Sequence, residues 1–185
     1  MTIARDGRLD PDEVKLYYDL AACQSMELDL VMLVERSGTP VPCESARRFP
    51  DGKPRMVIGG YHWAADVNRS DGRNARLSVE SLFVVRRSDV STASLASMLR
   101  NNDQNLRVKI SAYRASGDKR TGDRDPTFEL EIDEGRITAL VLTTGGPWQA
   151  PSELIRFAYR NLTIRSAAQL ETGQVGPQNE CLIGD

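Results

Sequence analysis

The feature that most restricts how this chain folds is the alternation of apolar and polar residues in "LRVKISAYR", residues 106–114. Successive side chains of an extended strand point to opposite faces, whereas one face of a helix repeats every three or four residues. The segment therefore predicts a strand with one face on a core and one polar face. We expect Leu106, Val108, Ile110 and Ala112 to face the core, and Arg107, Lys109, Ser111 and Tyr113 to face away.

A second alternating segment, "TFELEID", spans residues 127–133. It predicts that Phe128, Leu130 and Ile132 point inward, and that Glu129, Glu131 and Asp133 share the polar face. The following "EGR" predicts a turn, so we expect a hairpin with the next apolar segment, "ITALVLTT". The carboxylates of a glycosidase lie about 5 to 10 Å apart, so the acidic row alone does not exclude a sugar site, but nothing else in the sequence supports one.

One short helix is predicted between two strands in residues 77–114. The strand in "ARLSVESLFVVRR" ends in a run from Leu82 to Val85 that is apolar throughout, which is typical of burial on both faces. Ser91 or Thr92 is predicted to cap the helix, and Asn101 or Asn102 to end it in a left-handed conformation. Its apolar stripe is predicted to consist of Leu95, Met98 and Leu99.

A further helix is predicted near the start of the sequence, from about Pro11 to Ala22. Asp10 is a suitable cap, proline is favoured at the first helical position, and Glu13 completes a capping box. Its apolar face, which must dock on the same chain or on a neighbour, consists of Val14, Tyr17, Tyr18 and Ala21.

The remaining segments alternate between strand and loop signals. Residues 26–35 predict a strand, and residues 36–54 predict a long loop because they contain four prolines. Residues 55–66 resume as a strand with a glycine pair that suggests a bulge, and residues 154–170 predict a late strand with a bulge near residues 159–162. The tail from Glu171 is predicted to be mobile unless a partner holds it, since it is rich in Gly, Gln and Asn.

These segments predict a mainly β fold, a small antiparallel barrel or sandwich of about six to eight strands. One short internal helix and an added N-terminal helix complete it. We expect an N-terminal helical extension over residues 1–25, a β-barrel domain over 26–169 and a flexible tail over 170–185. A length of 185 residues fits one such core.

Composition excludes several classes of function. The net charge of −2 argues against a dedicated nucleic-acid binder or a polybasic membrane anchor. No window reaches the roughly eighteen apolar residues of a membrane helix, and the start lacks the apolar segment of a secretory signal, so we expect a protein made in the cytoplasm. Three widely spaced cysteines, Cys23, Cys43 and Cys181, favour ordinary reduced thiols.

Residues suited to catalysis or metal binding are sparse. The single histidine, His62, lies between two aromatic residues in a predicted strand, where packing is the ordinary role. "GDKRTGDRD" has aspartates, but the interleaved basic residues and the spacing do not match a calcium loop. "TTGGPWQAP" lacks the lysine of a phosphate loop. We therefore expect no enzyme, no cofactor and no metal, with Trp63 in the core and Trp148 as an interface anchor.

The order of these elements resembles the haemolysin-coregulated protein family. The likeness rests on "MELDLVML", the proline-rich loop, the strand with Tyr61 and Trp63, and "LSVESLFVVRRSDVSTASLASMLRNNDQNLRVKISAYRA", followed by "PTFELEIDEGRITALVLTTG" and "SELIRFAYRNLTIRS". It covers about residues 26–166. The N-terminal helix and the tail have no counterpart in the minimal family domain, and "NRSDGRNAR" is shorter than the family's usual ring-stacking loop.

The resemblance implies a homo-oligomer: six-membered rings that stack into the hollow inner tube of a type VI secretion system. It implies sheath, spike or baseplate proteins and secreted effectors as partners, and export through the machine without a signal peptide, with neither nucleic-acid binding nor stable membrane insertion. Loops 36–54, 67–76 and 115–126 are the predicted stacking loops. The predicted residues for ring stacking or the lumen are Arg47, Arg48, Arg73, Arg107, Lys109 and Trp148.

Other interpretations stay open at this stage. The polar strand faces are equally consistent with a wet lumen and with ordinary solvent exposure. A contractile-phage tail tube protein would share the barrel and the ring, and a mainly acidic lumen would favour its DNA conduit. A monomeric β-barrel enzyme or ligand-binding protein would use the space near Tyr61, His62 and Trp63, and an adaptor would dock its N-terminal helix on a partner.

Overall fold

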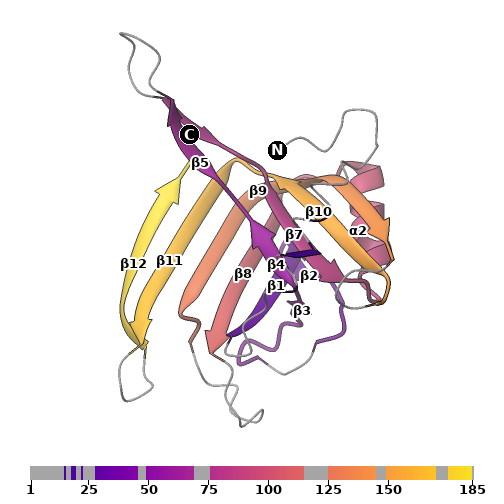
Figure 1. Cartoon of the computed structure of the whole chain (residues 1–185), viewed down its shortest axis with the longest axis horizontal. Coiled ribbons are helices and arrows are strands. Elements are labelled where there is room, and N and C mark those ends of the chain that lie inside the picture. The colour runs from indigo at the N-terminus through magenta and orange to yellow at the C-terminus, as the bar shows by residue number, and fades with distance from the viewer. Residues whose placement is uncertain are drawn as a thin grey trace.

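The described residues fold into two packed antiparallel sheets that share one strand, a separate two-stranded arm and one internal helix (Figure 1). The structure is a computed structural model that describes residues 15, 18–19, 22, 28–45, 49–68, 76–114, 125–144, 149–169 and 175–184. Its elements are β1 (Leu28–Arg36), β2 (Thr39–Pro40), β3 (Met56–Val57), β4 (Gly60–His62), β5 (Ala65–Asn68), β6 (Arg76–Val79), β7 (Leu82–Arg87), α2 (Thr92–Asn101), β8 (Leu106–Arg114), β9 (Phe128–Thr143), β10 (Ser152–Ala158), β11 (Asn161–Gln169) and β12 (Val175–Ile183).

The mainly β prediction is confirmed, with an open arrangement in place of a closed barrel. Sheet A contains β1, β2, β3, β8, the first half of β9, β11 and β12, and sheet B contains the second half of β9, β10, β7 and β4. The strand order has free ends within the described residues. Those residues form twelve strands because several of the strands are only two to four residues long.

The hairpin predicted after Asp133 is wrong. Residues 128–143 form one continuous strand, β9, which leaves sheet A and enters sheet B at a corner beside Gly135. Glu134 adopts a φ of 51°, and a Cβ on Gly135 would lie 3.0 Å from the carbonyl oxygen of Leu106. These residues therefore bend the strand between two sheets, a common device at the corners of packed sheets, and do not reverse it.

The late strand predicted over residues 154–170 is also divided at this corner. β10 pairs with the second half of β9 and β11 pairs with its first half, with Tyr159 and Arg160 between them. The predicted bulge therefore marks a true break in the strand. Together β9, β10 and β11 make one long antiparallel ribbon that spans both sheets.

The core lies between the two sheets and under α2. The inward residues predicted for β8 and β9 are confirmed, since Leu106, Val108, Ile110 and Ile132 are fully buried. Helix α2 contributes buried Leu95 and Met98 and ends at Asn102, whose φ is 51°. Its N-cap is Ser91, but the Ser91 side chain makes no cap hydrogen bond. The Asp89 carboxylate instead accepts a hydrogen bond from the Ser91 backbone N–H at 2.8 Å.

The outer face of sheet A, to which the alternation of β8 directs Ser111 and Tyr113, is partly covered by the proline-rich segment. Tyr113 is 6% exposed because Phe49, from the proline-rich segment, packs against it with ring centroids 5.7 Å apart. The Arg55 guanidinium lies 4.1 Å from the centre of the Phe49 ring. A bidentate pair with Asp51 fixes that guanidinium at 2.8 and 2.9 Å. This predicted loop is therefore tied to the sheet.

Near its two ends, the chain contains one strand that was not predicted and described residues of the predicted N-terminal helix. Residues 175–183 form β12, which pairs with β11, so this part of the segment predicted to be mobile is a strand. Gln and Asn side chains do not prevent strand formation, because the ladder uses backbone groups. Of the predicted helix from Pro11 to Ala22, the described residues Lys15, Tyr18, Asp19 and Ala22 are helical. The domain boundaries at residues 25 and 169 stay predictions.

Candidate assembly surfaces

The region proposed for a pocket, near Tyr61, His62 and Trp63, is occupied by internal packing. The Trp63 indole N–H donates to the Tyr159 hydroxyl at 2.5 Å, and that hydroxyl donates to the Glu80 carbonyl oxygen at 2.8 Å. Tyr61 stacks on Phe128 with centroids 6.3 Å apart. The His62 ring lies 3.8 Å from the Glu80 carboxylate. These side chains therefore act as packing residues.

Metal-ligand clusters and membrane helices are absent from the part of the chain that the structure describes. Within the described ranges, no group of three or more His, Cys, Asp or Glu side chains is arranged to hold a metal ion. No helix among the described residues is both long and apolar enough to cross a bilayer. The surfaces with a distinct chemistry are instead a charged sheet face, an apolar arm, a strand edge and a polar depression.

The charged face of sheet A consists of Arg107, Lys109, Glu129, Glu131, Asp133, Arg165 and Glu180. Basic and acidic side chains alternate across neighbouring strands, from β8 through β9 and β11 to β12. Arg165 bonds Glu131 at 2.7 Å and Glu180 at 2.6 Å, and Lys109 lies 3.4 Å from Glu131. Arg107 also bonds Glu131. Three cations thus converge on one carboxylate.

Glu131 is the centre of this network and is only 2% exposed. Burial would raise its pKa, but the hydrogen bond from Arg165 and the charges of Lys109 and Arg107 outweigh burial, so the pKa lies below its usual range. The pKa of Arg165 is raised because it donates to Glu131 and Glu180. Glu131 is therefore ionised at neutral pH, and its network links side chains of four neighbouring strands, β8, β9, β11 and β12.

A separate two-stranded arm, formed by β5 and β6, projects away from both sheets (Figure 1). Its pairing places Ala65 opposite Val79 and Val67 opposite Leu77, so these four residues share one face. Val67, Leu77 and Val79 are 52%, 50% and 43% exposed, whereas Asp66 and Ser78 lie on the opposite face. The arm is therefore amphipathic, with an apolar side that is about half exposed.

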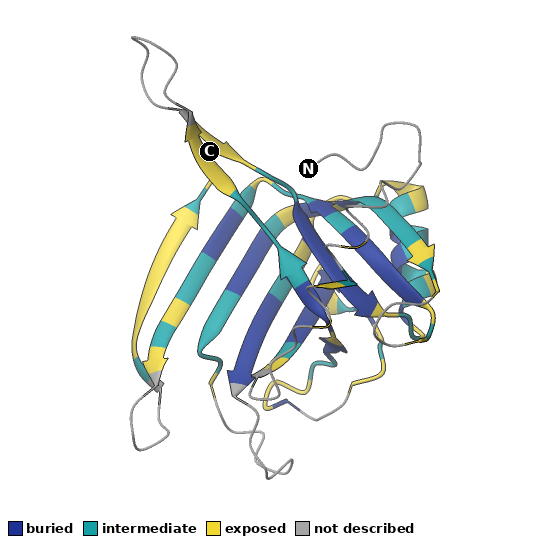
Figure 2. Cartoon of the chain, in the orientation of Figure 1, coloured by how far each residue is buried: buried dark blue, intermediate teal, exposed yellow. Residues whose placement is uncertain are grey.

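Within the described ranges, one edge of sheet A is β12, which pairs there with β11 alone. Figure 2 shows it exposed along most of its length. Such an edge offers unpaired backbone groups to another chain. Two residues of β12 limit its pairing with other chains: Pro177 lacks a backbone N–H, and the charged side chain of Glu180 disfavours unspecific pairing.

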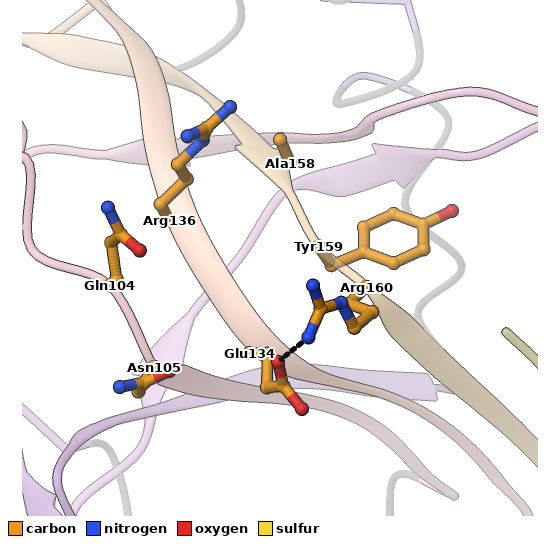
Figure 3. Close-up of a pocket in the computed structure, with 7 residues that line it drawn as sticks. All are labelled: Gln104, Asn105, Glu134, Arg136, Ala158, Tyr159 and Arg160. Atoms are coloured by element: carbon orange, nitrogen blue, oxygen red, sulfur yellow. Dashed lines mark hydrogen bonds and ion pairs between the residues drawn. The ribbon is translucent and has the colours of Figure 1, made fainter. Parts of the chain in front are cut away.

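A polar depression of about 320 Å³ lies at the corner where β9 changes sheets (Figure 3). It is lined by Gln104, Asn105, Glu134, Arg136, Ala158, Tyr159 and Arg160. Arg160 bonds Glu134 at 2.9 Å, and both side chains are well exposed. Most of the side chains that line it are polar, so its chemistry suits a polar protein contact more than an apolar ligand.

Only two of the six predicted site residues, Arg107 and Lys109, lie in the described ranges, and the structure places both on the charged face. Arg47, Arg48, Arg73 and Trp148 lie outside the described residues. Sequence reasoning missed Arg165 and Glu180, which depend on the register of β11 and β12. It also missed the apolar face of the arm, although the alternation of Leu77 and Val79 was visible.

The fold is similar to those of solved Hcp structures. Hcp1 from Salmonella typhimurium is 11% identical with a TM-score of 0.60, over 84% of this chain and 94% of that chain. Hcp1 from E. coli EAEC 042 is 7% identical with a TM-score of 0.62, over 83% and 97%. Hcp3 from Pseudomonas aeruginosa is 12% identical with a TM-score of 0.58, over 83% and 97%. At these identities the likeness defines the class of fold, the two-sheet fold of Hcp proteins.

The family assignment rests on the sequence. No curated protein matches the chain. The family model described as "Type VI secretion system effector, Hcp" matches residues 55–165, which is more than half of the chain. The chain therefore belongs to the Hcp family, whose members are structural components of the type VI secretion tube.

Proposed function

We propose that this protein is a tube subunit whose copies form hexameric rings that stack into the inner tube of a type VI secretion system. The observation that carries the proposal is an open two-sheet fold with a free strand edge and a projecting amphipathic arm. Sheath, spike or baseplate proteins and transported effectors are the expected partners, and the protein would leave the cell through the machine itself.

Ring closure would use the open ends of the sheets. Head-to-tail contacts between identical copies generate a closed ring when the rotation fits, and an exposed edge is stabilised when a neighbour covers it. β12 supplies one such edge, and the short strands β2 and β3 lie at the other side of sheet A. Pro177 and Glu180 on β12 would favour one specific partner over indiscriminate pairing.

Ring stacking would use the arm, which ends in the predicted stacking loop 67–76. Its apolar face leaves Val67, Leu77 and Val79 about half exposed, and adjacent exposed apolar side chains usually mark an interaction site. Arg47, Arg48, Arg73 and Trp148 remain predicted contact residues. Changing Arg47 and Arg48 to Glu is expected to weaken contacts between rings without unfolding the chain.

The charged face of sheet A favours a secretion tube over the DNA conduit of a phage tail. Its acidic residues Glu129, Glu131, Asp133 and Glu180 are matched by Arg107, Lys109 and Arg165. The face is therefore close to neutral and not mainly acidic. As a lumen lining it would be polar and weakly charged, which suits the passage of proteins of varied charge.

The test is the mass and shape of the assembled protein, measured by light scattering on a sizing column and negative-stain microscopy. Six copies of a 20.5 kDa chain give about 123 kDa, and ring-shaped particles are expected at that mass. Leu77→Asp is expected to leave single rings but to abolish stacks. Val90→Asp is the control, because Val90 is 62% exposed and lies outside the arm. A wild-type monomer would overturn the ring, and stacking by the Leu77 variant would overturn the role of the arm.

A further inference from the structure

The arm of β5 and β6 leaves the two sheets at a narrow base. Among the described residues, its strands pair only with each other. The chain enters the arm from β4 through Trp63 and Ala64 and leaves it into β7 through Glu80 and Ser81. The Glu80 N–H donates to the Ala64 carbonyl oxygen at 2.9 Å, which closes the arm at this base. The direction of the arm therefore depends on what holds the base in place.

Packing along the apolar face of the arm does not fix its direction. A groove of about 440 Å³ is lined on the arm by Leu77 and Val79, and on its other side by Tyr159, Arg160 and Ile183 among others. Leu77 and Val79 are about half exposed, so the described residues of the body do not brace the arm along this face. The contacts that orient the arm must therefore lie at its base.

Tyr159 bonds both sides of that base. It lies at the corner between β10 and β11, beside Ala158 and Arg160 (Figure 3). Its hydroxyl accepts a hydrogen bond from the Trp63 indole N–H at 2.5 Å and donates one to the Glu80 carbonyl oxygen at 2.8 Å. Burial raises the pKa of this hydroxyl, so it keeps the proton that it donates at neutral pH. Because Trp63 precedes β5 and Glu80 follows β6, one hydroxyl joins both strands of the arm to the corner.

We propose that Tyr159 is a positioning residue for the arm: its hydroxyl clasps both strands at the base and holds the arm at one angle to the sheets. The consequence for ring stacking rests on the proposed function. An arm that turned freely would lose that freedom on docking, and the lost entropy would oppose contact between rings. An arm that is already held docks at a smaller entropic cost, so the clasp favours stacking without contacting the next ring.

The experiment removes the hydroxyl alone, with Tyr159→Phe, and measures where the arm lies. One spin label is attached to Ser78→Cys on the polar face of the arm, and another to the exposed native Cys181 on β12. Cys23 and Cys43 are replaced by Ser. The labelled chain is diluted with unlabelled chain, so that double electron–electron resonance records the distance within one copy. Negative-stain microscopy over a series of protein concentrations reports stacking.

Tyr61→Phe is the matched control, because the Tyr61 ring stacks on Phe128 and its hydroxyl makes neither of the two bonds at the base. We expect Tyr159→Phe to widen the distance distribution. It should also raise the concentration at which stacks form by about fivefold or more, since one neutral hydrogen bond contributes about that factor to an equilibrium. Trp63→Phe removes one of the two bonds and should have an intermediate effect. The control is expected to match the wild type.

Each result decides one part of the proposal. An unchanged distance distribution in Tyr159→Phe, or an equal widening in the control, would overturn the clasp. A wider distribution with stacks that form at the same concentration as in the wild type would overturn its effect on stacking. If circular dichroism shows that Tyr159→Phe is unfolded, Trp63→Phe decides by the same criteria. If the wild type forms no rings, the hexamer proposal fails, but the distance measurement still tests the clasp.

Discussion

Replacing Glu131 with Gln tests whether the charged face of sheet A stabilises the fold or contributes nothing measurable to its stability. Glu131 is 2% exposed and receives hydrogen bonds from Arg165, at 2.7 Å, and from Arg107. A bond to a charged group contributes about 1.5 to 3 kcal/mol. Gln keeps one neutral acceptor, and the cations are 24% to 50% exposed and can be hydrated. We therefore expect a loss of about 2 kcal/mol, below the 3 to 5 kcal/mol of a fully buried broken pair.

The assay is thermal or urea unfolding at a fixed protein concentration. For a domain of this size a loss of 2 kcal/mol corresponds to a decrease in Tm of about 4 to 8 °C. Glu134→Gln is the matched control, because its pair with Arg160 is exposed at 48% and 67% and its loss should cost about 0.5 kcal/mol or less. Equal losses for the two variants would refute the reasoning.

The pH dependence provides a second readout of the same residue. The pKa of Glu131 is lower in the folded state than in the unfolded chain. The contribution of Glu131 to the free energy of unfolding is therefore fully present above the ordinary carboxyl pKa, about 4.3. It is lost as the pH falls through the lower pKa that Glu131 has in the folded state. The difference between wild type and Glu131→Gln should shrink in that acidic range. A difference that grows on acidification would contradict the assignment.

Three further predictions concern single residues elsewhere. Burial raises the pKa of Cys43 to about 11, so at pH 8 iodoacetamide should label it far more slowly than exposed Cys181, and equal rates by mass spectrometry would count against this. Arg86→Met should lower the free energy of unfolding by about 3 to 5 kcal/mol, because it leaves the buried Glu153 carboxylate without its partner at 2.8 Å. A loss under about 1 kcal/mol in urea unfolding would argue that Glu153 is protonated. Gly135→Ala should cost about 1 to 3 kcal/mol, since its Cβ would lie 3.0 Å from a backbone oxygen, and an unchanged Tm would show that the corner relaxes.

Local patterns in the sequence were sufficient where the cause is local. The alternation of Leu106, Val108 and Ile110 predicts both the strand and its buried face, because a strand places every second side chain on one side. Asn102 ends α2 with a left-handed φ because its side chain tolerates that conformation. The family resemblance likewise followed from the order of such segments, and the family match confirms it.

Features that depend on distant residues could not be predicted in this way. "EGR" contains the usual signals of a turn, but whether Glu134 reverses the chain or bends it depends on β10 and β11, which pair with both halves of β9. Tyr113 is buried by Phe49, far away in the sequence. The network around Glu131 required the relative register of four strands, whereas the sequence showed only that each strand has a polar face.

The passage of β9 from one sheet to the other has a mechanical consequence. Because a single strand runs through both sheets, and β10 and β11 follow it around the corner, the sheets share backbone ladders and have no seam along which one could slide over the other. A force applied to one end of the subunit would load many hydrogen bonds of this ribbon at once, in shear, and would not peel them apart singly. In the proposed tube, each subunit would therefore transmit an axial push as one stiff body.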